Sequence, residues 1–431
     1  PAAGFGYNVY PNESVFQTLL LDRMGDFKTS ADYLNTFMEL QGSVKLPGTF
    51  TGDQKDVFFG TKVDNDYNFT EPNGYNMHHG TVLWGLARHY LYSGDREWLL
   101  KAAPHMIRAA NWIIEQRAQT KLLDENGKKV THYGLLPAGA LEDAHDWAFW
   151  YATNAYACMG MESMAIAFGK AGLPEADFIK READAYHKDI RQSIETTSEL
   201  CPVVRLRNNT FVPYVPSRPH QRFRYFGPKK AEYYDRYNLG IYPTMRLSAT
   251  REVLYGSVVL LKAGLIAPEE PMAGWVLDDW EDNITLSSSL NLNVHGWVDD
   301  EYWFSRGGMV FQANLQNPVG IYLLRQEIPA TIRGLYDNFV SCLYPDVNAH
   351  TEEYREWGHG SGPFYKCPDE ARFISQVCDL LFVETKGELW LAAGTPRRWL
   401  EAGQNIELKK AQTEYGEISY SLRPGKLPET I

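Results

Sequence analysis

Four stretches of the sequence place carboxylates beside aromatic rings. They span residues 65–80, 136–147, 297–308 and 350–363. Cleavage of a glycosidic bond needs one carboxyl group to protonate the leaving oxygen and a second to act as base or nucleophile, while aromatic faces stack on sugar rings. Each acid alone has a simpler interpretation as a helix cap. Four such stretches in one chain favour a sugar-cleaving site.

The second stretch, LPAGALEDAHDW, comes just before an apolar segment and ends on Trp147. A general acid needs a raised pKa, and an aromatic, partly desolvated surround such as Trp147 and Trp150 would raise it.

Two adjacent histidines, His78 and His79, could be considered as metal ligands. Adjacent side chains on one strand or helix point apart, and no third ligand is spaced to join them, so we expect no metal. Binding of sugar hydroxyls, or a capping role, is the favoured interpretation. The sequence holds no GxGxxG, GxxxxGK[ST] or GxSxG motif, so it supports neither nucleotide-dependent nor serine-hydrolase chemistry, and we expect no cofactor.

Helical hairpins fill most of the chain and must position these stretches. Apolar residues recur at helical spacing before Ser93-Gly94-Asp95, and a second helix follows, which Pro104 should kink or restart. Residues 147–171 are apolar on nearly all sides and predict a buried inner helix that ends at Gly172. The helix after Pro174 is amphipathic and should lie outside it.

The same plan recurs over 247–280 and 319–344, with one or two helices before Gly42 and another over 369–384. A solenoid would show a fixed short repeat, whereas here the spacing is irregular and long loops separate the units. We therefore predict a closed ring of hairpins with one face built from loops.

Two regions break the helical pattern. Residues 201–243 alternate in β fashion with repeated Pro, and they hold eight Lys and Arg against two acids, a local charge of +6. This insertion is either a solvated hairpin or a site for a glycan carboxylate. Residues 386–431 predict a small C-terminal β-structure after a catalytic unit that covers 1–385.

Composition excludes several classes of protein. The 431 residues carry a net charge of −12 with 13% aromatics, which argues against binding to nucleic acid. No apolar run approaches the roughly 20 residues that span a bilayer. Five widely spaced cysteines suggest neither a zinc site nor a disulfide framework. The chain opens on Pro1 without a signal peptide, so we expect a processed or partial chain, periplasmic or secreted on substrate grounds.

With these motifs in place, the chain resembles the six-hairpin glycosidases, and among them the bacterial α-L-rhamnosidase-like enzymes, over about residues 5–385. The resemblance rests on GTVLWGLARHYLYSGDREWL, LPAGALEDAHDW, EYWFSRGGMVFQANLQNP and TEEYREWGHGSGPF. It implies a mainly α fold, an (α/α)6 toroid with a β-hairpin insertion and a small C-terminal β-appendage. It also implies a glycoside hydrolase of complex plant or algal polysaccharides, inverting in mechanism.

The resemblance assigns roles residue by residue. It makes Glu142 or Asp143 the proton donor with Asp146 next in line, and Glu353 the catalytic base with Glu352 and Glu356 as rivals. The relatives' Arg-Gly-Pro form reads Arg306-Gly307-Gly308 here. The expected substrate-binding residues are Asp146, Trp147, His78, His79, Trp303, Arg306, Glu356 and Trp357.

Three alternatives stay open. A polysaccharide lyase on the same toroid would use the basic, Tyr-rich insertion, with His220, Tyr225 and Tyr233 as candidates. A sugar-binding or scaffold protein could retain the barrel without catalysis. An epimerase or isomerase ranks lower, because the late Glu-rich loop fits hydrolysis better.

Overall fold

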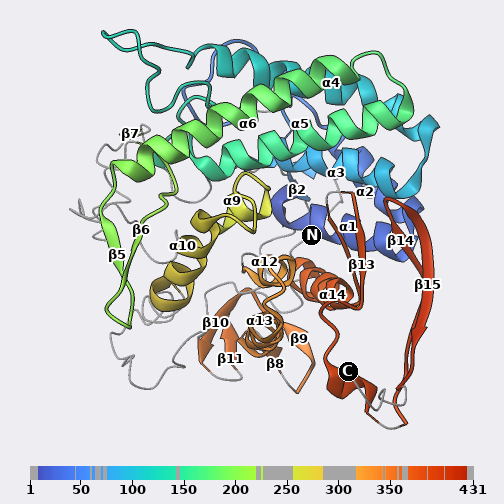
Figure 1. The fold of residues 1–431 in the computed structure, drawn as a ribbon. Coiled ribbons are helices and arrows are strands. Elements are labelled where there is room, and N and C mark those ends of the chain that lie inside the picture. Colours follow the sequence, from blue (N-terminus) through green and yellow to red (C-terminus); the bar gives the residue numbers. More distant parts are fainter. Residues whose placement is uncertain are drawn as a thin grey trace.

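Helices dominate the molecule, and β structure is limited to short ladders (Figure 1). This confirms the mainly α prediction. The computed structural model describes residues 8–43, 45–58, 61–63, 69–70, 75–141, 146–219, 225–226, 256–284, 317–341, 343–344, 346–356, 359–361, 367–385, 387–401 and 403–424.

Six of the described helices contact one another along a path that returns to its start. α1 contacts α3, α3 contacts α5, α5 contacts α9, α9 contacts α12, α12 contacts α14, and α14 contacts α1. We call these six the inner helices. They are α1 (Pro11–Met24), α3 (Met77–Ser93), α5 (Tyr151–Ala171), α9 (Val258–Lys262), α12 (Val319–Leu324) and α14 (Cys367–Leu381).

Five more helices of the described chain each pack against the inner helix that precedes them. We call them outer helices: α2 (Phe27–Glu39), α4 (Arg96–Ala118), α6 (Ala176–Glu199), α10 (Pro271–Asp279) and α13 (Ile328–Ser341). The prediction for the third hairpin is confirmed, because α5 is buried along most of its length while α6 buries one stripe that includes Ile179, Tyr186 and Ile190. Apolar spacing alone carried that information.

Glycines end the helices where the sequence predicts. Gly94, Gly172 and Gly264 have φ of 65°, 70° and 71°, a left-handed conformation that costs little without a Cβ. Asp95 caps α4 by accepting a hydrogen bond of 2.9 Å from the Trp98 N–H. Pro104 lies inside α4, which runs without a break, so the predicted restart at this residue is wrong.

The β-strands pair only in small antiparallel ladders. They are β1 (Asn8–Val9), β2 (Thr61–Val63), β3 (Phe69–Thr70), β4 (Asp146–Trp147), β5 (Val203–Arg205), β6 (Phe211–Pro213), β7 (Tyr225–Phe226), β8 (Leu343–Tyr344), β9 (Ala349–His350), β10 (Glu353–Glu356), β11 (His359–Ser361), β12 (Phe382–Glu384), β13 (Leu389–Leu391), β14 (Ile406–Thr413) and β15 (Gly416–Leu422).

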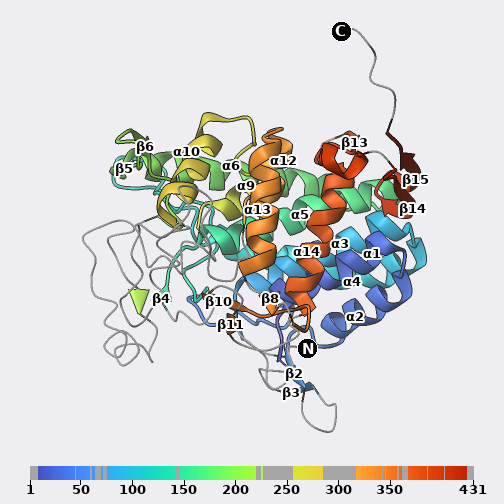
Figure 2. The same cartoon turned by 90° about the horizontal axis from the view of Figure 1, so that it is seen from below.

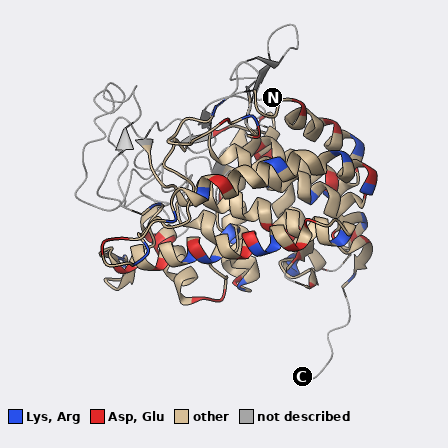
Figure 3. Cartoon of the chain, turned by 90° about the horizontal axis from the view of Figure 1, so that it is seen from above, with Lys and Arg blue, Asp and Glu red and all other residues tan. Residues whose placement is uncertain are grey.

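The C-terminal strands attach to the helical ring through charges. β14 packs against α1 and α3. Arg88 of α3 forms ion pairs with Glu384, at 3.3 Å, and with Glu414 in the β14–β15 turn. Charged side chains of both signs are interspersed over the described helices rather than gathered on one face (Figure 3). Within the described residues, no helix combines the length and apolar character needed to cross a bilayer.

We expect Gly80→Ala to destabilise the protein by about 1–3 kcal/mol, because α3 and α5 cross there with backbones in contact. A Cβ on Gly80 would lie 2.5 Å from the Tyr156 carbonyl carbon and 2.6 Å from the Ala157 Cα. Gly169→Ala on α5 is the control: its Cβ would meet nothing within 4 Å, so it should gain about 0.5–1 kcal/mol from helix propensity. Urea midpoints measure both, and equal shifts would contradict the close crossing.

Candidate functional site

The connections between helices fall into two sets. Turns from an inner to its outer helix are short, at residues 25–26, 94–95, 172–175, 263–270 and 325–327. Among the described helices, the sequence stretches from an outer to the next inner helix are long, at residues 40–76, 119–150, 200–257, 285–318 and 342–366, and we call them the long connections. All four acid-aromatic stretches lie on the long set. The stretches 65–80, 136–147 and 350–363 lead into the first turns of α3, α5 and α14, whereas 297–308 lies outside the described residues.

Figure 2 shows most of the labelled strands of these long connections on one side. β2, β3, β4, β8, β10 and β11 lie in its lower half, whereas β5 and β6 of the 200–257 connection lie at its upper left and β13, β14 and β15 at its upper right. We call the side that carries β2, β3, β4, β8, β10 and β11 the loop face, and it is the candidate site.

Most of the predicted site side chains fall outside the described residues. These are Glu142, Asp143, Trp303, Arg306 and Trp357; of Asp146, Glu353 and Glu356 the structure describes only the backbone. Their roles stay predictions. What the structure describes is the framework around them.

Paired backbone holds the segment that carries Glu142 and Asp143. Gly139 and Ala148, which flank it, exchange hydrogen bonds of 3.2 and 3.1 Å. The Thr49 N–H donates to the Ala138 carbonyl at 2.8 Å. The Asn154 side-chain oxygen accepts from the Leu136 N–H at 2.8 Å and ties the same segment to α5. Both ends of the predicted proton-donor loop are therefore fixed.

The basic insertion pairs with this segment. In the β4–β7 ladder Trp147 lies opposite Tyr225, and Asp146 lies opposite Phe226. The Tyr151 N–H at the start of α5 donates to the Ser217 carbonyl at 3.0 Å. The buried Arg218 guanidinium lies 4.9 Å from the centre of the Trp150 ring. Trp147 itself is half-buried. The described parts of the insertion, 217–218 and 225–226, thus lie beside residues 146–151.

His78 lies in the first turn of α3 beneath two tyrosines. Its ring is 4.8 Å from Tyr75, which stacks on Tyr10 at 5.5 Å, and its Nε2 is 2.9 Å from the Asn12 side-chain oxygen. His78 is fully buried while both tyrosines are partly exposed. A substrate at this point would meet the tyrosines first.

His79 has two backbone partners. Its Nδ1 accepts from the Phe58 N–H at 3.0 Å, and its Nε2 donates to the Ala109 carbonyl at 3.1 Å. Burial lowers the pKa of His79 to about 4, so the ring is neutral at pH 7. Because both nitrogens are used inside the protein, this geometry favours a structural role over the predicted contact with substrate.

The late Glu-rich stretch forms a hairpin. Glu353 lies opposite Ser361 and Glu356 opposite His359, with a register irregularity between Tyr354 and Glu356. Such an irregularity re-aims the side chains that follow it and is common beside active sites. The rival Glu352 is half-buried just before the strand.

The sequence did not reveal a pair of acids between α10, α12 and α13. Glu281 lies in a π-helical turn (Trp280–Ile284) and accepts hydrogen bonds from the Tyr322 hydroxyl and Arg333, each at 2.5 Å. Burial raises the pKa of Asp337 to about 7. The positive charge of Arg333 lowers this pKa, and the negative charge of Glu281 raises it. Perturbed acids and π turns both gather at functional sites.

Asp337→Asn tests this electrostatic environment. The folded-state pKa is raised from 3.8 to about 7, so ionisation of Asp337 destabilises the folded protein. This loss of stability begins above about pH 4 and reaches its full size above about pH 7. The Asn variant should match the wild type at low pH and exceed it by about 1–2 kcal/mol above pH 7, a figure reduced for partial exposure. Urea unfolding between pH 4 and 8 measures this. The exposed Asp346→Asn is the control; parallel profiles for Asp337→Asn and wild type would contradict the raised pKa.

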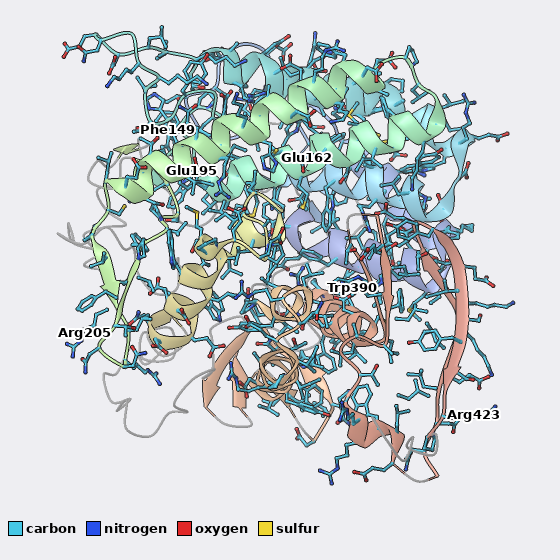
Figure 4. All side chains as sticks on the ribbon, in the orientation of Figure 1. Phe149, Glu162, Glu195, Arg205, Trp390 and Arg423 are labelled. Atoms are coloured by element: carbon cyan, nitrogen blue, oxygen red, sulfur yellow. The ribbon has the colours of Figure 1, made fainter. Side chains whose placement is uncertain are left out.

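Three side chains between α5 and α6 could hold a divalent metal. Cys158 and Glu162 are one turn apart on α5, and His187 Nδ1 on α6 lies 2.8 Å from the Glu162 carboxylate. The three ligand atoms lie within 4.8 Å of one another (Figure 4 labels Glu162). Zinc takes such ligands. Burial raises the pKa of the Cys158 thiol well above its usual value, which opposes metal binding. Sequence spacing does not reveal these three side chains as a group, because they lie on two different helices.

Comparison with known proteins gives a fold. No protein-family model and no curated protein matches the sequence. Among solved structures, a metal-independent α-mannosidase of Streptococcus pneumoniae, in a non-productive complex with α-1,6-mannobiose, aligns with a TM-score of 0.52 at 9% identity. The alignment covers 86% of this chain and 85% of that one. The two chains share a fold. A glycosidase aligns with a TM-score of 0.46 at 11% identity, and a variant of it in complex with glucose with 0.46 at 10%, each over 86% of this chain and 88% of that one.

Proposed function

We propose that the protein is a glycoside hydrolase built on an (α/α)6 toroid. The observation that carries the proposal is that three acid-aromatic stretches, 65–80, 136–147 and 350–363, lead into the inner helices α3, α5 and α14. The closed path of contacts among the inner helices supports the toroid. The fold shared with an α-mannosidase supports a sugar substrate.

In the proposed mechanism, Glu142 or Asp143 protonates the leaving oxygen and Glu353 activates water on the opposite side of the sugar. Water needs room between the two carboxyl groups, so inversion requires a separation of about 6.5–9.5 Å, whereas about 5 Å would point to retention. Trp147, Trp303 and Trp357 would stack on the sugars.

A panel of substrates tests the proposal. The protein is incubated with aryl α-L-rhamnoside, aryl α-D-mannoside, other aryl glycosides, and plant and algal polysaccharides, and reducing ends are followed over time. We expect continuous release from at least one substrate. Stoichiometric binding to a glycan of this panel without turnover would instead identify a sugar-binding barrel. The α-L-rhamnosidase-like specificity that the sequence resemblance implies is one arm of this panel.

A lyase is the second candidate, and the β4–β7 pairing favours it. That pairing brings the Tyr225 backbone beside the Trp147 segment, and the buried Arg218 of the same insertion lies against Trp150. A lyase would neutralise a uronate with Arg and abstract a proton with Tyr or His. Its product is an unsaturated uronate with new ultraviolet absorbance, which a hydrolase does not produce.

A further inference from the structure

The third hairpin brings three metal-ligating side chains together where α5 packs on α6. Cys158 and Glu162 lie four residues apart on α5, which places them on one side of that helix. The Cys158 Sγ lies 4.0 Å from the Ala183 carbonyl oxygen of α6, so this side of α5 faces α6. His187 follows Ala183 by one helical turn, and its Nδ1 lies 2.8 Å from the Glu162 carboxylate. Two successive helices therefore bring a sulfur, an oxygen and a nitrogen to one point.

The spacing of these three atoms is close to that of a zinc site. Ligand atoms on a tetrahedral zinc lie about 3.3–3.6 Å apart, because the bonds to zinc are about 2.0–2.3 Å long. Here one Glu162 oxygen lies 3.9 Å from the Cys158 Sγ and 2.8 Å from the His187 Nδ1. No two of the three atoms are more than 4.8 Å apart. Side-chain movements of about 1 Å would therefore bring all three onto one ion.

The types of ligand and their exposure also suit zinc. Thiolate sulfur, imidazole nitrogen and carboxylate oxygen all occur as zinc ligands, whereas magnesium and calcium prefer oxygen alone. Cys158 is buried, but 33% of the Glu162 side chain and 32% of the His187 side chain are exposed. An ion can therefore enter from solvent, and a water molecule can take the fourth position.

The charges around the three ligands do not exclude a dication. Glu162 and Asp184 act on Cys158 with negative charge, and Arg117 acts on it with positive charge. The Arg117 charge is met by Asp189 at 3.0 Å. A Cys158 thiolate and the Glu162 carboxylate would together carry two negative charges, which equal the charge of one zinc ion.

We propose that Cys158, Glu162 and His187 bind one zinc ion, which joins the inner helix α5 to the outer helix α6. The sulfur–zinc bond replaces the S–H bond, and the displaced proton passes to solvent. The ion stabilises the hairpin, because the three ligands meet only when the two helices pack together.

This site is separate from the candidate glycosidase site and does not depend on the proposed function. Glu162 lies 11 residues after Tyr151, about 16 Å along the α5 axis from the end that follows β4. The ion therefore has a structural role rather than a catalytic one.

Metal titration of the full chain, without an affinity tag and after treatment with a chelator, tests the proposal. Calorimetry with zinc should show saturable binding of one ion per chain. Cobalt(II), which can replace zinc, should give the near-ultraviolet charge-transfer absorption of a thiolate–cobalt bond. Zinc binding that does not saturate at one ion, or a cobalt complex without that absorption, would overturn the proposal.

Variants locate the ion. Cys158→Ser, Glu162→Gln and His187→Gln should each weaken zinc binding by about 100-fold or more, because each removes one of three ligands. Cys158→Ser should also abolish the charge-transfer absorption. Cys367→Ser, which removes an exposed thiol on α14, is the control and should keep the zinc affinity of the wild type. Unchanged zinc affinity in Glu162→Gln and His187→Gln, whose changes are at partly exposed side chains and should permit folding, would overturn the assignment.

Thermal unfolding with and without zinc tests the structural role. Zinc should raise the Tm of the wild type and of Cys367→Ser, because it binds the folded chain more tightly than the unfolded chain. It should not raise the Tm of His187→Gln. Equal zinc-dependent shifts in the wild type and in His187→Gln would contradict an ion held between α5 and α6.

Discussion

Glu353→Gln is expected to lower kcat by about 10²–10⁴-fold on every substrate that the protein cleaves, because a neutral amide cannot take a proton from the attacking water. Its fold should be unaffected, since Gln keeps the size of the side chain. Glu352→Gln, one residue earlier, is the matched control and should keep nearly full turnover. Steady-state kinetics with a thermal unfolding scan of each variant measures both expectations.

The leaving group distinguishes a variant of the proton donor from a variant of the base. Of Glu142→Gln and Asp143→Asn, the one that removes the acid should lose about 10²–10⁴-fold on a natural glycan but much less on an aryl glycoside, whose leaving group needs little protonation. The base variant should lose activity on both. If Glu142→Gln, Asp143→Asn and Glu353→Gln all keep wild-type turnover on a cleaved substrate, the assignment of these carboxylates is wrong.

Arg117→Met should have the largest effect on stability, a loss of about 3–5 kcal/mol in the free energy of unfolding. Arg117 is fully buried near the end of α4. It donates to the Gly134 carbonyl at 2.8 Å and to Asp189 at 3.0 Å, and its guanidinium lies 3.9 Å from the centre of the Tyr186 ring. Met fills similar volume but leaves a buried carbonyl without this donor, and it leaves Asp189 paired with the partly exposed Lys129 at 3.0 Å.

The exposed Arg181→Met on α6 is the control for Arg117 and should change stability by no more than about 0.5 kcal/mol. Urea denaturation followed by circular dichroism measures both. A loss below about 1 kcal/mol for Arg117→Met would show that the buried ion pair between α4 and α6 contributes little. Arg117 also holds Gly134, eight residues before Glu142, so a fall in activity should accompany the loss of stability.

Local features of the sequence were enough to predict the helical hairpins. The apolar stripe of α6 and the left-handed glycines at 94 and 172 depend only on residues close by in the sequence. Helix periodicity and left-handed caps are properties of short segments. Pro104 shows the limit of that reasoning. Packing of α4 against α3 keeps the helix continuous through a residue that disfavours it locally.

The site depends on contacts between distant parts of the chain, which no local pattern encodes. The partners of His79 come from Phe58 and Ala109, and Trp147 pairs with Tyr225 across 78 positions of sequence.

The sequence by itself determined that acids and aromatics gather before the inner helices, since both the helix starts and the residue types can be read from it. Only the tertiary structure decided that Asp337 lies near Glu281 and that the proposed zinc ligands on α5 and α6 lie together. The reason is physical: burial and neighbouring charges set a pKa or form a binding site, and both arise when separate helices pack together.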